Sequence, residues 1–458
     1  MKSSEMWDLF PALSYLKENY QFLSWILTCF VILLVVIEVA FYLLITLYVV
    51  PKLNKNQNYM NKHRNVCPIA VGSDIMRVLL ELKDVYSINS FLKGFFLNIH
   101  DVNDIKHDNI KSFLAWALYN LSLSTLTVSQ HGEIDSFIRN MEDKFDIKFE
   151  EGYNENISHV KMTLEDIPFI HRPLMMYVFA GLMDILLNFT LLKCIGGFTQ
   201  LEIDNTKYWF RSCNNDKPPI ILFHGITSGW VFYIRFIYTI AERRTVILID
   251  VDAIKVKSLN FNVPNAEQVT SIVVKILQRH QFSNTKASII GHSFGSILAT
   301  WVLKTRPDIV SHFTILDPVS ILLCLPDVAY NFIYRKPSTI MQFLIYFCAS
   351  RELTISNLLH RNFIWHNNLL NLDSLPANIP VIVGLSGNDE VLNSPVVSKY
   401  IDIINRKREN DKLYPITTLY FNQYSHGQCL VSSSALNTIK DALYSSEKLT
   451  RKHVHFSL

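Results

Sequence analysis

The chain has 458 residues, of which 49% are hydrophobic and 18% charged, and its formal net charge is +3. This length allows one large domain with additional segments. The small net charge, without a basic stripe interleaved with aromatic residues, argues against a nucleic-acid-binding protein. A mean hydropathy of +0.18 is high for a soluble protein and points to contact with a membrane.

The chain contains seven scattered cysteines, none in a Cys-x-x-Cys pair, and no Cys/His cluster has the spacing of zinc ligands. An odd number without a pattern favours free, mostly buried thiols, with a few luminal disulfides as the alternative. We therefore expect neither a metal ion nor an organic cofactor.

Residues 25–50 form a long apolar run with Trp25 and Tyr48 near its ends and Pro51 directly after it. A membrane-spanning helix needs about 20 mostly apolar residues, and aromatic residues favour its interfaces. We predict a tail and transmembrane anchor in residues 1–50, which Pro51 ends. A cleaved signal peptide is the alternative, but its apolar core would span roughly 7–15 residues and follow a basic start.

Glu38 interrupts this run, and we expect a carboxyl group without a visible partner, protonated or paired in a homo-oligomer. Basic residues follow the run at Lys52, Lys55, Lys62 and Arg64, which favours a cytoplasmic position for the rest of the chain.

A second apolar stretch covers residues 173–192, where Asp184 and Asn188 lie four residues apart and so share one helical face. This pattern suits a helix that lies on the membrane, or packs on the following domain, better than a second span.

Residues 51–65 form a basic, Asn-rich linker. Residues 66–200 are predicted to be mostly helical, because apolar residues recur at helical spacing in 75–82 and 110–126. We assign 51–200 to the linker and this helical region, and 201–450 to an α/β domain.

Eight strand-like runs alternate with helical segments after residue 200, and several are near-continuous Ile/Val/Leu runs typical of strands buried on both faces. This alternation predicts a mostly parallel sheet covered by helices. The predicted strands are Leu201–Ile203, Trp209–Ser212, Pro219–Phe223, Thr245–Ile249, Ala287–Ile290, His312–Leu316, Val381–Leu385 and Thr417–Phe421.

The sixth and seventh strands are separated by an insertion at about 318–378, far longer than an ordinary connection. It contains the apolar, helix-like segment Thr339–Cys348. We expect the insertion to be a functional lid.

The pentapeptide Gly291-His-Ser293-Phe-Gly295 follows a predicted strand and precedes a predicted helix. A serine nucleophile needs such a tight strand-to-helix turn to expose its Oγ, and the flanking glycines avoid clashes. We predict that Ser293 is the nucleophile of an acyl-transfer reaction. A glycine-containing turn without chemistry is the alternative.

The loop after the third predicted strand begins His224-Gly225-Ile226, a pattern that supplies part of an oxyanion hole. We place the hole in the Gly225–Ile226 loop and at Phe294, with the backbone N–H groups of Ile226 and Phe294 as donors. Each such donor contributes roughly 3–4 kcal/mol to stabilisation of the transition state.

Asp389 and His426 follow the last two predicted strands, in the order that an acid and a base take after the nucleophile. Asp389 would orient the imidazole, and His426 would take the proton of Ser293. Asp317, after the sixth strand, is the alternative acid. Glu390 would point away from Asp389, and Cys429 would be a buried thiol.

These motifs, covering about residues 200–445, resemble the α/β-hydrolase superfamily. Segments 316–335, 350–353 and 361–365 further resemble a group of membrane-anchored hydrolases of fungi, protists and plants. The resemblance implies the α/β-hydrolase fold and a Ser-His-Asp triad, but no particular substrate.

We therefore expect a membrane-anchored serine hydrolase acting on a lipid-like ester, such as an acylglycerol, sterol ester or lysophospholipid, at the endoplasmic reticulum or a lipid droplet. An acyltransferase or thioesterase with the same acyl-enzyme is one alternative. A non-catalytic membrane scaffold that retains the fold is another.

Overall fold

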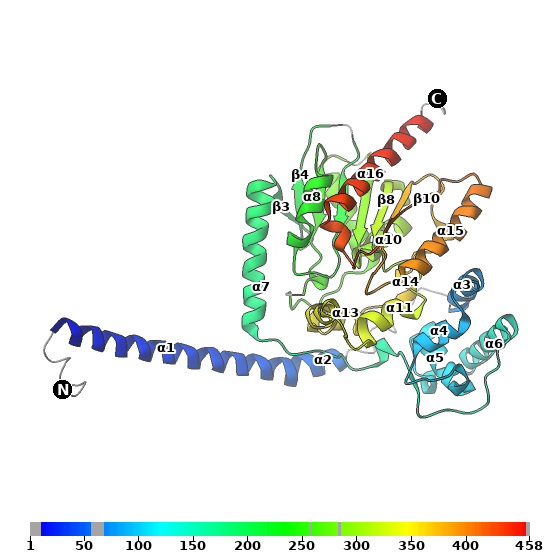
Figure 1. Cartoon of the computed structure of the whole chain (residues 1–458), viewed down its shortest axis with the longest axis horizontal. Helices are drawn as coiled ribbons and strands as arrows, with labels where there is room; N and C mark the ends of the chain where they lie inside the picture. Colours follow the sequence, from blue (N-terminus) through cyan, green and yellow to red (C-terminus); the bar gives the residue numbers. More distant parts are fainter. Residues whose placement is uncertain (1–10, 56–67, 216, 257, 283–284, 455–458) are drawn as a thin grey trace.

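The computed structural model of the chain describes residues 11–55, 68–215, 217–256, 258–282 and 285–454 (Figure 1). The first ten residues and most of the predicted basic linker, including Lys62 and Arg64, lie outside the described residues.

The centre of the fold is an eight-stranded sheet with the order β10-β9-β8-β7-β5-β6-β4-β3. Its strands run parallel except β4, which is antiparallel to both β3 and β6. All eight predicted strands are confirmed, with ends that differ by at most three residues. They are β3 (Thr199–Ile203), β4 (Thr206–Arg211), β5 (Ile220–Phe223), β6 (Val246–Ile249), β7 (Ala287–His292), β8 (Val310–Leu316), β9 (Val381–Ser386) and β10 (Ile416–Phe421).

Helices cover both faces of this sheet (Figure 1). Along β5, Ile220 and Leu222 pack into one hydrophobic cluster, and Ile221 and Phe223 into another, as the alternation of side chains along a strand requires. The first cluster includes α8 (Ile234–Ile240) and α16 (Ser433–Val454), and the second includes α9 (Ala266–Arg279), α10 (Gly295–Thr305) and α15 (Ser394–Asn410).

The N-terminal helical unit, residues 68–164, packs beside the sheet domain (Figure 1), and one hydrophobic cluster runs through both. The predicted helix over 110–126 is too long. It ends at Tyr119, because Asn120 adopts the left-handed conformation (φ +53°) that terminates helices. The unit contains α3 (Pro68–Glu81), α4 (Ile88–Phe95), α5 (His107–Tyr119), α6 (Val128–Phe145) and the antiparallel pair β1 (Phe96–Leu97) and β2 (Ser158–His159).

The insertion between β8 and β9 is bonded to the N-terminal helical unit. The Tyr86 hydroxyl donates to Asp327 at 3.1 Å, and Trp365 Nε1 donates to the Ala117 carbonyl at 2.9 Å. The helices of the insertion are α11 (Pro326–Ala329), η10 (Tyr330–Tyr334), α12 (Ile340–Ile345), η11 (Tyr346–Ser350), α13 (Leu353–Arg361) and α14 (Trp365–Asn368).

Two helices are long and apolar enough to cross a membrane, a test that core helices and signal sequences also pass. The first spans Asn19–Lys55 and joins α1 (Pro11–Leu44), η1 (Ile45–Val49) and α2 (Val50–Lys55). The second spans Leu174–Ile195 and joins α7 (Leu174–Leu187) to η6 (Asn188–Ile195). In Figure 1, α1 projects away from the sheet domain, and α7 runs along that domain, crosswise to α1.

The prediction that Pro51 ends the first helix is wrong, because the helix continues to Lys55. The π-helical segment η1 directly precedes Val50, whose N–H donates to the Ile45 carbonyl, five residues back. This wider turn shifts the hydrogen-bond register where proline has no N–H to donate.

The expectation that Glu38 lacks a partner is also wrong. Its carboxylate accepts the backbone N–H groups of Leu174 at 2.7 Å and Met175 at 2.8 Å, at the start of α7. The first N–H groups of a helix have no acceptor within the helix, and its positive N-terminus attracts a carboxylate. Glu38 therefore fixes α1 to α7.

The insertion also holds both apolar helices. Arg361 donates to the Leu53 carbonyl and the Asn54 side chain at the end of α2, at 3.2 and 2.8 Å. Glu352 accepts a hydrogen bond from the Tyr177 hydroxyl of α7 at 3.2 Å. These contacts attach the C-terminal end of the first apolar helix and the N-terminal part of the second to the folded domain.

Candidate active site

Ser293 lies in the turn between β7 and α10 with a φ of +53°, a strained conformation for a residue other than glycine. A Cβ at position 291 would lie 2.4 Å from the Gly295 carbonyl oxygen. One at position 295 would lie 2.3 Å from the Phe223 carbonyl oxygen. The turn can therefore form only with glycine on both sides of the serine.

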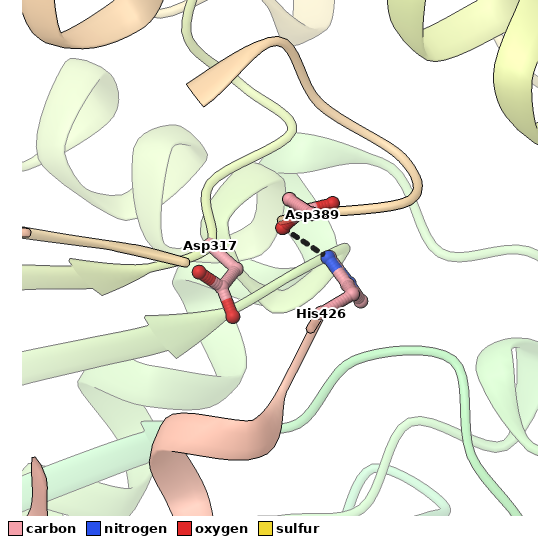
Figure 2. Close-up of side chains that lie close together, drawn as sticks. All are labelled: Asp317, Asp389 and His426. Atoms are coloured by element: carbon pink, nitrogen blue, oxygen red, sulfur yellow. Dashed lines mark hydrogen bonds and ion pairs between the residues drawn. The ribbon is translucent and has the colours of Figure 1, made fainter. Parts of the chain in front are cut away.

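The structure brings Ser293, His426 and Asp389 together. His426 Nε2 lies 2.8 Å from Ser293 Oγ, and His426 Nδ1 lies 2.7 Å from Asp389 Oδ2. The other carboxylate oxygen of Asp389 accepts the N–H groups of Val391 and Leu392, which fixes the acid. Figure 2 shows Asp389 and His426 facing one another.

Asp317 has other partners than the imidazole. Its carboxylate accepts the backbone N–H of Gly427 at 2.8 Å, and both the N–H and the hydroxyl of Ser386, at 2.8 and 3.0 Å. Asp317 thereby joins the ends of β8 and β9 to the turn directly after His426. In this geometry it positions the loop that carries the histidine.

Glu390 has a function that the sequence did not suggest. Its carboxylate accepts the backbone N–H of His426 at 3.0 Å, and Arg335 donates to its carbonyl at 2.6 Å. Two consecutive acidic residues thus hold the backbone and the ring of one histidine.

The carboxylates around His426 determine its charge state. Burial lowers the pKa of His426, but the negative charges of Asp389, Asp317 and Glu390 raise it more, to about 9. Burial, together with the charge of Asp389, raises the pKa of Asp317. The site therefore stabilises an imidazolium ion, the species formed when the histidine takes a proton.

The backbone N–H groups of Ile226 and Phe294 have no hydrogen-bond acceptor among the described residues, and both residues line the cavity beside Ser293. Two such donors are what an oxyanion hole requires. Gly225, the other predicted residue of this loop, offers no free donor, because its N–H donates to the Tyr233 hydroxyl at 2.7 Å. Its part is steric, since a Cβ there would lie 2.8 Å from Ser293 Cβ.

A buried polar network of Tyr233, His292 and His224 holds the loop that contains Gly225 and Ile226. The Tyr233 hydroxyl lies 2.7 Å from His292 Nδ1, and burial keeps the pKa of His292 well below its ordinary value. His224 bonds to the Gly225 carbonyl at 2.8 Å and accepts the Val251 N–H at 3.3 Å. Sequence reasoning missed Tyr233, for which no local pattern gives a signal.

Cys429 and two histidines of the insertion, His360 and His366, lie outside the Ser293–His426–Asp389 chain of hydrogen bonds. Cys429 is a buried thiol 3.8 Å from Asp317, and burial raises its pKa well above the ordinary value. His360 is buried and bonds to the Ser356 carbonyl at 2.9 Å, and His366 bonds to Asn367 at 3.2 Å.

Among the described residues, Asp317, Asp389 and His426 are close enough together to hold a metal ion. The hydrogen bonds given above already use both imidazole nitrogens of His426 and both carboxylate oxygens of Asp389. These contacts fit a proton-transfer chain better than a metal centre.

The cavity beside Ser293 is almost entirely apolar. The insertion supplies one part of its wall, and the N-terminal helical unit supplies another. From the insertion come Val319, Leu323, Cys324, Leu325, Val328, Ala329, Phe332, Ile333, Ile345, Ala349, Leu359, Phe363 and Trp365.

A family model described as the α/β hydrolase fold matches residues 218–414. Comparison with curated protein sequences gave no match. Similar solved structures include a bacterial membrane phospholipase A (15% identity, TM-score 0.38, covering 61% of this chain and 96% of that chain). Another is a thermophilic esterase from Thermogutta terrifontis (11% identity, TM-score 0.40, covering 54% of this chain and 98% of that chain). A third is an α/β hydrolase fold protein from Chitinophaga pinensis (16% identity, TM-score 0.38, covering 54% of this chain and 96% of that chain).

Proposed function

Because this chain belongs to the α/β-hydrolase superfamily, we propose that it is a membrane-anchored serine hydrolase that cleaves carboxylic esters of a lipid-like substrate. The observation that carries the proposal is the hydrogen-bonded chain from Ser293 through His426 to Asp389, at 2.8 and 2.7 Å. The apolar cavity beside Ser293 suits the hydrocarbon part of such a substrate.

In the first half of the reaction, Ser293 Oγ attacks the ester carbonyl while His426 Nε2 takes the hydroxyl proton. Asp389 holds the imidazole with Nε2 directed at the serine and offsets its positive charge. The negative oxygen of the tetrahedral intermediate is bound by the N–H groups of Ile226 and Phe294. His426 then gives its proton to the leaving alcohol, and an acyl-enzyme remains.

In the second half, His426 takes a proton from water as the water oxygen attacks the acyl carbonyl. The new tetrahedral intermediate then breaks its bond to Ser293 Oγ, which takes the proton back from His426, and the acid is released. An alcohol or lysolipid in place of water would give an acyltransferase. Analysis of products with an added acceptor separates these outcomes.

The membrane assignment rests on α1 and α7. Glu38 lies on α1 at the level where α7 begins, and α1 projects past α7 on its N-terminal side (Figure 1). Residues beyond Glu38 contact the folded domain. Ile45 is buried, and the ring centroids of Phe41 and Tyr177 lie 6.0 Å apart. We place the membrane at residues 20–37, with Glu38 at its surface.

In this arrangement α7 lies flat on the membrane. Its polar side faces the sheet domain, since Asn188 is buried and Asp184 packs against Gly229. Its opposite side exposes large apolar residues, as interfacial helices do. They are Met175, Met176, Val178, Phe179, Leu182, Ile185, Leu186 and Phe189.

The direct test is labelling with a fluorophosphonate, which modifies activated serines, in membranes that contain the full chain or Ser293→Ala. We expect labelling of the wild type only, together with hydrolysis of p-nitrophenyl butyrate that Ser293→Ala lacks. Labelling that persists in Ser293→Ala, or a wild type that turns over neither esters nor thioesters, would contradict the proposal.

A further inference from the structure

We propose that the N-terminal helical unit, residues 68–164, forms the wall that sets the length of the acyl chain this enzyme accepts. The inference rests on the proposed esterase function and assigns a role to a part of the chain outside the hydrolase domain. It also specifies the substrate class, which is an ester whose acyl part is an unbranched hydrocarbon chain.

One continuous cavity joins the N-terminal helical unit to Ser293. The cavity that contains Ser293 and His426 is also lined by side chains from α3, α4 and α5 and from the segment after β2. These positions are more than 100 residues from Ser293 in the chain. They are Ile75, Phe91, Phe95, Phe113, Trp116, Ala117 and Met162.

The lining of this cavity is apolar. Apart from the groups at Ser293, the lining offers no charged side chain and no hydroxyl group. Trp116 carries a polar N–H, but that group donates to Thr163 Oγ1 at 2.9 Å and is thereby satisfied. Such a wall favours methylene groups, and it would leave a buried polar or branched hydroxylated group without partners.

Packed aromatic rings make the wall rigid. Phe95 lies with its ring centroid 5.1 Å from that of Phe91 and 4.7 Å from that of Phe113, within packing distance of both. A wall of mutually packed aromatic rings yields less to an overlong chain than one built from flexible side chains would.

The helical unit is attached to the insertion. This attachment matters because the wall can limit the length of the acyl chain only if the distance between the wall and Ser293 is fixed. A Cβ at Gly94 would lie 2.3 Å from Pro326 Cγ, so α4 and α11 are in direct contact. The hydrogen bonds from Tyr86 to Asp327 and from Trp365 to Ala117 fasten the same boundary. The helical unit is therefore fixed to the insertion.

Ala117→Leu is the sharpest test, since it adds volume at the cavity wall. Ala115→Leu is the control on the same helix, because Ala115 is also buried, with 0% exposed against 5% for Ala117, but does not line the cavity. Rates with p-nitrophenyl esters from butyryl to hexadecanoyl give the ratio of kcat/KM for long and short chains. Thermal unfolding compares the stability of the two variants.

Each methylene excluded from an apolar site lowers binding about fourfold. Exclusion of two methylenes should lower the dodecanoyl-to-butyryl ratio about 15-fold in Ala117→Leu and leave it within twofold in Ala115→Leu. Phe113→Leu removes ring volume from the wall and should raise the hexadecanoyl-to-dodecanoyl ratio, which tests the inference even if Ala117→Leu does not fold.

Unchanged chain-length ratios in folded Ala117→Leu and Phe113→Leu, or equal shifts in Ala115→Leu, would overturn the inference. Failure of the proposed function looks different, because the wild type would then hydrolyse none of the esters. In that case alkyl fluorophosphonates of graded length, read out by labelling alone, still report the depth of the cavity.

Discussion

The two buried aspartates near His426 have different partners, and this difference predicts different costs when each is replaced. Asp389→Asn leaves the shape of the site but cannot stabilise the imidazolium and favours the wrong tautomer, so we expect kcat to fall about 10⁴-fold. Asp317→Asn replaces the carboxylate that accepts the Gly427 N–H by an uncharged amide, which weakens the hold on the loop after His426. We expect kcat to fall about tenfold and the Tm to fall as well.

Rates of butyrate ester hydrolysis and thermal unfolding of both variants check this order. A larger loss of kcat in Asp317→Asn than in Asp389→Asn would mean that Asp317 is the functional acid.

The pH dependence follows from the carboxylates around His426. The histidine must be neutral to take the proton of Ser293, and its pKa is raised to about 9. The value of kcat/KM should therefore rise with pH, with a midpoint above 6.5 and towards 9. Glu390→Gln removes one of the charges that raise this pKa, so it should move the midpoint to lower pH. A wild-type midpoint at or below 6.5 would contradict the geometry.

At the scale of elements, α7 touches the loop that carries Ile226, the proposed oxyanion donor. A Cβ at Gly229, where φ is +155°, would lie 1.7 Å from Asp184 Oδ1 of α7. Gly229→Ala should therefore displace the loop and lower kcat about tenfold or more. It should also cost about 1–3 kcal/mol of unfolding free energy.

The double variant Gly229→Ala with Asp184→Ala removes the clash and should recover part of the activity. Gly132→Ala on α6 is the control, because nothing lies within 4 Å of the added Cβ. An equal loss of kcat in the single and double variants would show that α7 does not act on the loop.

At the scale of the whole molecule, local patterns predicted the sheet and the three side chains that meet at Ser293, because buried strands and the glycines around Ser293 are visible over a few residues. Contacts between distant segments were not predictable. Glu38 finds its partners 136 and 137 positions later, in a helix whose N-terminus no pattern places beside α1. The Tyr233–His292 pair and the cavity wall from α3–α5 likewise depend on tertiary packing between helices and strands that are distant in the sequence.

The bond from Glu38 to α7 has a consequence for where the protein resides. If Glu38 marks the membrane surface, the eighteen residues 20–37, of which only Gln21, Ser24 and Thr28 are polar, cross the hydrocarbon layer. As a helix they are about 27 Å long. That length matches the bilayer of the endoplasmic reticulum, about 27 Å thick, and falls short of the plasma membrane at about 32–33 Å.

Inserting four leucines after Val31 lengthens this span by about 6 Å. We expect the lengthened full chain to shift towards thicker membranes relative to the unaltered chain, as seen by fluorescence microscopy with organelle markers. A chain with residues 26–37 permuted at constant length is the control and should stay in place. Equal distributions of the lengthened and permuted chains would contradict sorting by hydrophobic mismatch. In such sorting the length of one helix, and not the chemistry of Ser293, determines in which membrane the protein resides.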